Sequence, residues 1–169
     1  MADTLVNRVA KSSLITFDLE KLYQIGTRKA LDLSQWLDHG IVLREKDFRT
    51  KLKDHDWKAY QDQLIALFCS SDAVLPAWAS LLVTTYLQPY ARKVVMGTLA
   101  DLEIQLFSDK IKNIDLKPFK DKSVIIKGCS DKSVPEDAYV QLITKLQPVV
   151  KSLFYGEACS SVPLFKKKK

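Results

Sequence analysis

Two short runs of apolar residues stand out along the chain, and each is followed at a similar distance by a second apolar run. The first runs are Leu64–Phe68 ("LIALF") and Val124–Lys127 ("VIIK"), and the second are Lys93–Met96 ("KVVM") and Ser152–Tyr155 ("SLFY"). Short, nearly continuous apolar runs are typical of strands that are buried on both faces of a parallel sheet. The pattern therefore predicts four strands.

The segments between the paired runs have helical periodicity. Apolar residues recur at intervals of three and four, which indicates one buried helix face in each segment: Ala79, Leu82, Val83, Tyr86 and Leu87 in the first, and Tyr139, Leu142, Ile143 and Leu146 in the second. Each segment begins with a Pro, which the first turn of a helix tolerates because its missing N–H would be unpaired there. Ser133 and Glu136 are interpreted as a capping box for the second helix. Each helix is expected to end at Leu-Gln-Pro, because the residue before Pro avoids helical geometry.

The two segments also resemble each other residue by residue. When Cys69 is aligned with Cys129 and one gap is placed at Leu75, the identical pairs are Cys-Ser, Val74/Val134, Pro76/Pro135, Ala79/Ala138, Thr85/Thr144, Leu-Gln-Pro and the closing Gly. Matches of so many residue types indicate an internal duplication. Between the two copies, Thr98 and Asp101 are expected to cap a connecting helix.

These elements predict an α/β fold with one doubly wound, mostly parallel sheet built from two duplicated βαβ units, and an N-terminal α+β extension. The first strands of the two units are expected to be neighbours at the centre of the sheet. We expect a single domain over residues 1–169, in five segments. These are the extension (1–62), the first repeat (63–97), a connecting helix and loop (98–122), the second repeat (123–156) and a C-terminal segment with a Lys tail (157–169).

The extension does not belong to the repeat. Leu14–Leu19 and Lys29–Leu33 are interpreted as a hairpin around Gly26, and Arg44–Asp54 as a polar helix. Ser34 is expected to cap a short helix between them.

Composition changes this picture little. The chain is 47% hydrophobic and 27% charged, which is typical of a globular protein. The absence of a long apolar run predicts no leader and no membrane span, and hence a cytoplasmic protein. The formal net charge is +6, and four of the positive charges belong to Lys166–Lys169. We expect this tail to be solvated, so nucleic acid is not expected as a partner beyond weak tail contacts.

The three cysteines are the candidate chemistry. Cys69, Cys129 and Cys159 are each followed by a serine, namely Ser70, Ser130 and Ser160. An odd number of cysteines without a leader argues against a disulfide framework. Because ligands bind at the carboxyl ends of parallel strands, the three thiols are expected at one edge of the sheet.

Three thiolates at one edge would bind zinc or an iron–sulfur cluster as cofactor, with the adjacent serines lining it. The candidates for a fourth ligand, or for an acid/base group, are Asp72, Asp131, Glu157 and His55. Two alternatives stay open. The chain could be a thiol-dependent enzyme or sulfur carrier that uses Cys69 or Cys129, or a non-catalytic interaction module whose cysteines only pack. The sequence contains no nucleotide-binding motif.

Several stretches, including "LREKDFR", "CSSDAVLPAWA", "KGCSDKSVPEDAY" and "YGEACSSVPL", resemble the bacterial domain-of-unknown-function family 2480. The likeness covers nearly the whole chain. The family has no assigned reaction, so no catalytic residue can be transferred. Its members are often encoded near iron–sulfur assembly genes, and the resemblance therefore implies iron–sulfur assembly proteins as partners and an accessory role in cluster assembly.

Overall fold

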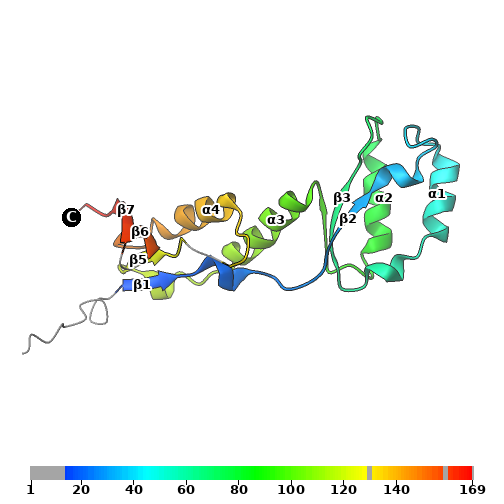
Figure 1. Cartoon of the computed structure of the whole chain (residues 1–169). Coiled ribbons are helices and arrows are strands. Elements are labelled where there is room, and N and C mark those ends of the chain that lie inside the picture. The colour runs from blue at the N-terminus through cyan, green and yellow to red at the C-terminus, as the bar shows by residue number, and fades with distance from the viewer. Residues whose placement is uncertain (1–13, 129–130, 158–159, 169) are drawn as a thin grey trace, which may run out of the picture. The chain divides into compact units, whose positions relative to one another are not determined.

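The computed structural model describes residues 14–128, 131–157 and 160–168. Contacts divide the chain into two compact units, one of residues 24–105 and the other of residues 1–23 and 106–169. Each unit holds its own mostly parallel sheet with helices (Figure 1). The α/β class is therefore confirmed. The expectation of one continuous sheet is wrong.

The three-stranded unit, residues 24–105, contains the parallel strands β2 (Arg28–Asp32), β3 (Leu64–Phe68) and β4 (Lys93–Met96) in the order β2-β3-β4. Its helices are α1 (Glu45–Asp54) and α2 (Ala77–Leu87), with the 3-10 helices η2 (Leu33–Trp36) and η3 (Trp57–Tyr60). Ile65 and Leu67 of β3 pack with Val83 of α2 in one buried cluster. The predicted apolar stripe of the first helix thus forms this core.

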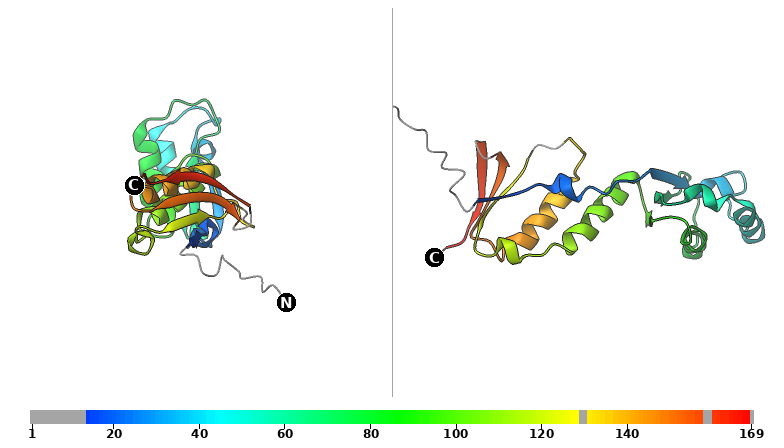
Figure 2. Two further views of the ribbon diagram at one scale, coloured as in Figure 1. Left: turned by 90° about the vertical axis from the view of Figure 1, so that its left-hand side faces the viewer. Right: turned by 90° about the horizontal axis from the view of Figure 1, so that it is seen from below.

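The four-stranded unit contains β1 (Leu14–Phe17), β5 (Ser123–Ile126), β6 (Ser152–Glu157) and β7 (Ser160–Lys166) in the order β1-β5-β6-β7. The first three are parallel, and β7 runs antiparallel to β6. Helix α4 (Glu136–Leu146) lies on one face of this sheet (Figure 2), where Leu142 packs against Val124 and Ile126. The unit also has η1 (Leu19–Leu22) and η4 (Lys117–Phe119), and α3 (Leu99–Lys112) has residues in both units.

The two sheets share one pattern of main-chain hydrogen bonds. Asp62 and Asp121 both have positive φ, 59° and 56°, and their N–H groups donate to the carbonyls of Tyr90 and Val149 at 2.9 and 2.8 Å. In β3 and β4, Leu67 pairs with Met96, and in β5 and β6, Ile126 pairs with Tyr155. The second pair lies as many positions after the first pair in the sequence as Asp121 lies after Asp62. Strands β2-β3-β4 therefore correspond to β1-β5-β6.

This correspondence corrects the sequence alignment. The constant spacing needs no gap at Leu75, and it makes Cys129 the counterpart of Ser70 rather than of Cys69. Asp72 and Asp131 correspond as well. The alignment on Cys-Ser was wrong because strand pairing, not the identity of two loop residues, sets the register.

The N-terminal extension supplies one strand to each sheet. β1 pairs in parallel with β5, and β2 pairs in parallel with β3, so the expected hairpin around Gly26 is wrong. Apolar periodicity identifies a strand but does not identify its partner, because both pairings bury the same face. That the two units fold as one domain, with the boundaries expected from the sequence, stays a prediction.

The helix ends agree in part with the predictions. Thr98 and Asp101 cap α3, with Thr98 N–H donating to Asp101 Oδ2 at 2.7 Å and Asp101 N–H to Thr98 Oγ1 at 3.3 Å. Helices α2 and α4 end at Leu87 and Leu146, as the Leu-Gln-Pro motif predicts.

Other caps differ. Pro135 occupies the N-cap of α4 without a side-chain cap, so the capping box of Ser133 and Glu136 does not form. Asp32, rather than Ser34, caps η2. In the described part of the chain, no helix is both long and apolar enough to cross a membrane.

The Lys tail begins inside a strand. Lys166 is the last residue of β7 and pairs with Ser152, and the Lys167 N–H donates to the Lys151 carbonyl at 2.9 Å. The expectation of a wholly solvated tail is therefore wrong for these two residues.

Candidate functional site

The predicted three-cysteine site depended on β3 and β5 being neighbours. They lie in different sheets, so that geometric argument is wrong. Cys69 follows β3 in the three-stranded unit, whereas Cys129, Cys159 and Ser130 lie outside the described residues. Within the ranges that the structure describes, no group of three His, Cys, Asp or Glu side chains could hold a metal ion.

Cys69 has the surroundings of a packing residue. It is partly buried against the core cluster of the three-stranded unit, and its Sγ lies 3.3 Å from Ser71 Oγ. A serine hydroxyl is a much weaker proton acceptor than the His or carboxylate that normally activates a thiol. These contacts favour the interpretation of Cys69 as a small apolar residue at a crowded strand end.

The carboxyl edge of the three-stranded sheet is organised around Asp32, at the end of β2. Its carboxylate accepts hydrogen bonds from Ser34 N–H at 2.9 Å, from Ser70 N–H at 3.0 Å and from Ser70 Oγ at 2.5 Å. Burial raises the pKa of Asp32, but the hydrogen bonds from Ser70 and Ser34 outweigh it and bring the pKa to about 2. Ser70, expected to line a cofactor, thus ties β3 to β2.

His55 and Asp72 were candidate fourth ligands. His55 Nε2 lies 2.9 Å from the Tyr60 hydroxyl, and its ring contacts Trp36 and Trp57 edge-on. Burial lowers the pKa of His55 and so favours the neutral imidazole. His55 is thus part of an aromatic cluster, while Asp72 is exposed in the loop after β3.

The carboxyl edge of the four-stranded sheet carries several charged groups. Lys127, just after β5, places its Nζ 3.5 Å from Asp18 Oδ2, and Asp131 N–H donates to Glu20 Oε2 at 3.3 Å. The negative charge of Asp18 raises the pKa of Lys127, with smaller contributions from Glu20 and Glu157. Three carboxylates therefore act on one ammonium at this edge.

Glu157 is the unusual member of this group. It is the last residue of β6, and its Oε1 is buried with no hydrogen-bond partner in the described part of the chain. A buried carboxylate oxygen without a partner is costly and uncommon. The sequence analysis named Glu157 as a ligand candidate but had no signal for its burial. Ser160, another candidate, is exposed at the start of β7.

Sequence reasoning missed the two aspartates that organise these edges. Asp18 directly follows β1 and Asp32 is the last residue of β2, in "FDL" and "LDL", and each caps a 3-10 helix. The repeated apolar-Asp-Leu motif could have identified them, because Asp is a preferred N-cap residue.

Comparison with known proteins gives a family without an activity. No curated protein and no solved structure matches the chain. The sequence model of one family, described as a protein of unknown function (DUF2480), matches residues 3–167. Since this match covers nearly the whole sequence, the chain belongs to the DUF2480 family.

Proposed function

We propose that this protein binds a soft metal ion or an iron–sulfur species at the carboxyl edge of the four-stranded sheet. The proposed ligands are the thiolates of Cys129 and Cys159 and the carboxylate of Glu157. The observation that carries the proposal is the buried Oε1 of Glu157, which has no hydrogen-bond partner among the described residues. Thiolates and carboxylates are both zinc ligands, and a bound cation would remove the cost of burying that oxygen.

Strand pairing supports the choice of these two cysteines. β5 and β6 are parallel neighbours, so Lys127–Gly128 and Glu157 follow or end adjacent strands at the same edge. Cys129 directly follows Gly128, and Cys159 comes two residues after Glu157. Both thiols are therefore tethered within a short length of chain to one edge, where sheets of this kind commonly bind ligands.

The proposal narrows the site expected from the sequence. Cys69 belongs to the other unit and is left out of the ligand set. Asp131, Ser130 and Ser160 flank the two cysteines in the sequence and belong to the surroundings of the proposed site. A cytoplasmic, accessory role in iron–sulfur cluster assembly, with assembly proteins as partners, is part of the same proposal and rests on the family resemblance.

The test is metal analysis of protein purified without oxygen, together with its absorption spectrum. We expect zinc or iron close to one equivalent per chain, with visible charge-transfer bands if a cluster is bound. Cys129→Ser and Cys159→Ser should each remove the metal. Glu157→Gln should weaken metal binding by about tenfold or more, because even residues that only hydrogen-bond to a metal ligand contribute that much.

Cys69→Ser is the matched control, because it removes one thiol from the same chain but from the other unit. It should retain the full metal content. Metal-free wild-type protein after anaerobic reconstitution would contradict the proposal, as would equal loss of metal in Cys69→Ser and Cys129→Ser.

A further inference from the structure

The opposite edge of the four-stranded sheet is lined by lysines. β5 and β6 begin here and the antiparallel β7 ends here. Lys151 N–H donates to the Lys122 carbonyl at 2.7 Å, and Lys167 N–H donates to the Lys151 carbonyl at 2.9 Å. Three adjacent segments therefore hold Lys122, Lys151 and Lys167 in a row, with neighbours about 4.8 Å apart.

This row, together with Lys117, Lys120 and Lys166, is called the lysine edge, and all six residues are exposed. In the described structure Asp115 Oδ1 accepts the Lys117 N–H at 3.0 Å, and an ion pair joins Lys167 Nζ to Asp121 Oδ1 at 3.8 Å. Both side chains are largely exposed, so this pair neutralises little of the local field. The edge is therefore strongly positive.

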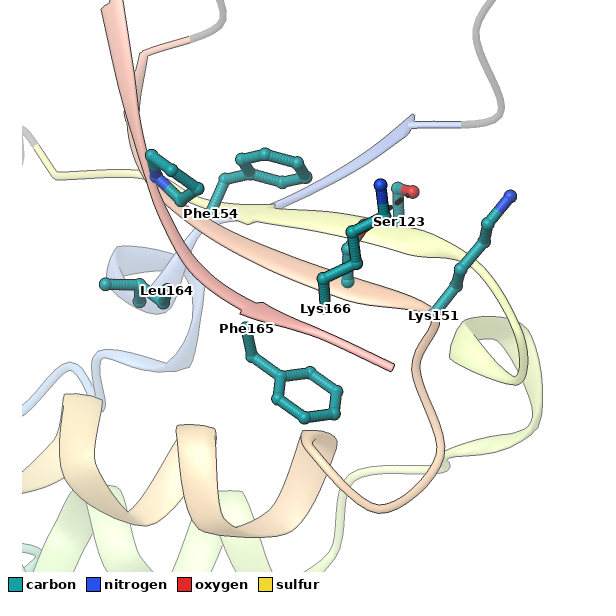
Figure 3. A pocket seen from close by; sticks show the side chains of 8 residues that line it. Ser123, Lys151, Phe154, Leu164, Phe165 and Lys166 are labelled. Carbon is teal, nitrogen blue, oxygen red and sulfur yellow. Dashed lines mark hydrogen bonds between the residues drawn. The ribbon is translucent and has the colours of Figure 1, made fainter. Parts of the chain in front are cut away.

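A recess lies beside the row, on the face of the sheet that points away from α4. It is a cavity of about 610 Å³ lined in part by Ser123, Phe154, Pro163, Lys151 and Lys166. Figure 3 shows the Phe154 ring and the Lys166 side chain on this same face, while Phe165 points toward the helices. An aromatic ring and two ammonium groups thus share one open groove.

We infer that the lysine edge and the Phe154 recess bind single-stranded nucleic acid. Lysine ammonium groups contact phosphates as point charges, and an exposed ring gives a base a surface on which to stack. Every arginine among the described residues lies in the three-stranded unit. The edge therefore lacks the forked donors that read guanine, and binding should be independent of sequence.

The recess favours nucleic acid over a lipid surface. Phe154 is half-buried in a groove, so a flat base can enter and stack on it, whereas insertion into a bilayer needs a protruding side chain. Lys166 and Lys167 were expected to be solvated. The pairing of Lys166 with Ser152 fixes Lys166 at the recess, which gives it a geometry that a free tail lacks. The inference concerns the opposite end of the unit from the proposed metal site and is independent of it.

The experiment is fluorescence anisotropy with a labelled oligothymidylate of about 16 nucleotides, the upper end of the site size of one small binding fold. We expect binding that weakens with salt, with log K falling by about 0.7 per contacted phosphate for each tenfold rise in salt. The triple variant Lys122→Gln, Lys151→Gln, Lys166→Gln should lower that slope by about 2. Phe154→Leu removes the stacking surface and should weaken oligonucleotide binding by about fivefold or more.

The matched control is Lys46→Gln, Lys53→Gln, Lys58→Gln, which removes the same charge from exposed positions of the three-stranded unit. It should leave the slope and the affinity unchanged, and circular dichroism should show that all variants are folded. Absence of oligonucleotide binding at low salt, or equal losses in the two triple variants, would overturn the inference. So would binding to phosphatidylserine vesicles without binding to the oligonucleotide, which would assign the edge to a membrane surface.

Discussion

At the carboxyl edge of the three-stranded sheet, Asp32 accepts three hydrogen bonds from uncharged donors of Ser34 and Ser70. At the corresponding position of the four-stranded sheet, and considering donors among the described residues, Asp18 accepts a hydrogen bond from Glu20 N–H at 3.0 Å and faces the charged Lys127. The counterpart of Ser70 there is Cys129, whose thiol is a much weaker donor than a hydroxyl. The backbone pattern is shared, but of the two aspartates only Asp18 pairs with an ammonium group in the described part of the chain.

The difference indicates which edge is available for a ligand. The Asp32 carboxylate already accepts three hydrogen bonds from its own chain, so we assign it a structural role. The four-stranded edge has three carboxylates that act on one ammonium group, and within the described ranges Glu157 Oε1 has no hydrogen-bond partner. We therefore assign stability to one edge and binding to the other.

The largest expected effect comes from the helix positions that correspond between the units. Leu87 of α2 and Leu146 of α4 are both fully buried, so Leu87→Ala and Leu146→Ala should each lower the free energy of unfolding by about 3 kcal/mol. If the chain is one domain, calorimetry will show a single transition that both variants shift. Thr85→Ala and Thr144→Ala, at exposed positions of the same helices, serve as controls. Two transitions, each sensitive to one variant only, would contradict the single-domain prediction.

A smaller effect separates the two aspartates. At neutral pH, Asp32→Asn should lower the free energy of unfolding by about 1 kcal/mol, because it weakens charge-assisted bonds at a partly exposed group. Asp18→Asn removes a partly buried ion pair whose closest atoms are 3.5 Å apart, and it should cost less than that. Urea unfolding of the two variants measures the difference. Equal losses would mean that the Ser70 contacts add nothing to Asp32.

The pH dependence of the free energy of unfolding provides a second test of the role of Asp32. The pKa of Asp32 is about 2 in the folded protein, below the usual 3.8, so its ionised form favours the folded state. That contribution is complete above about pH 4 and disappears as the pH falls toward 2. The gap in stability between wild type and Asp32→Asn should therefore close over this range. A constant gap would show that Asp32 stabilises through packing instead.

The last prediction concerns the end of β7. Deleting Lys166–Lys169 removes the pairing with Ser152 and the bond to the Lys151 carbonyl. It should cost about 1 kcal/mol and lower the melting temperature by a few degrees. A deletion that starts at Lys168 should change neither value. If the longer deletion leaves the melting temperature unchanged, the tail is solvated, as its composition predicts.

The sequence predicted local elements much better than their assembly. β3 and β4 have the predicted limits because each is a short, mostly apolar run that is followed within two residues by Ser or Gly. β7 was missed because Pro163 and several exposed positions interrupt its pattern, although an edge strand tolerates both. The division into two sheets could not be foreseen, since strand order depends on packing between distant segments.

The sequence predicted which kinds of side chain could form the candidate site, but not where they lie in the fold. The sequence located thiols and Glu157 after apolar runs, but the equivalence of Ser70 and Cys129 required the strand register. The burial of Glu157 Oε1 depends on how β6 meets the segments around it. No property of residues 155–157 in the sequence distinguishes this carboxylate from a solvated one.

The four-stranded sheet has carboxylates at one end and lysines at the other, and this polarity has a kinetic consequence. Asp18 and Glu157 end parallel strands at the edge opposite to Lys122 and Lys151, so the unit carries a permanent electric dipole along its strands. A polyanion that diffuses toward the unit is then turned to meet the lysines first. Its arrival leaves the carboxylate end facing solvent, so a second, cationic partner can approach that end without competing for the same surface.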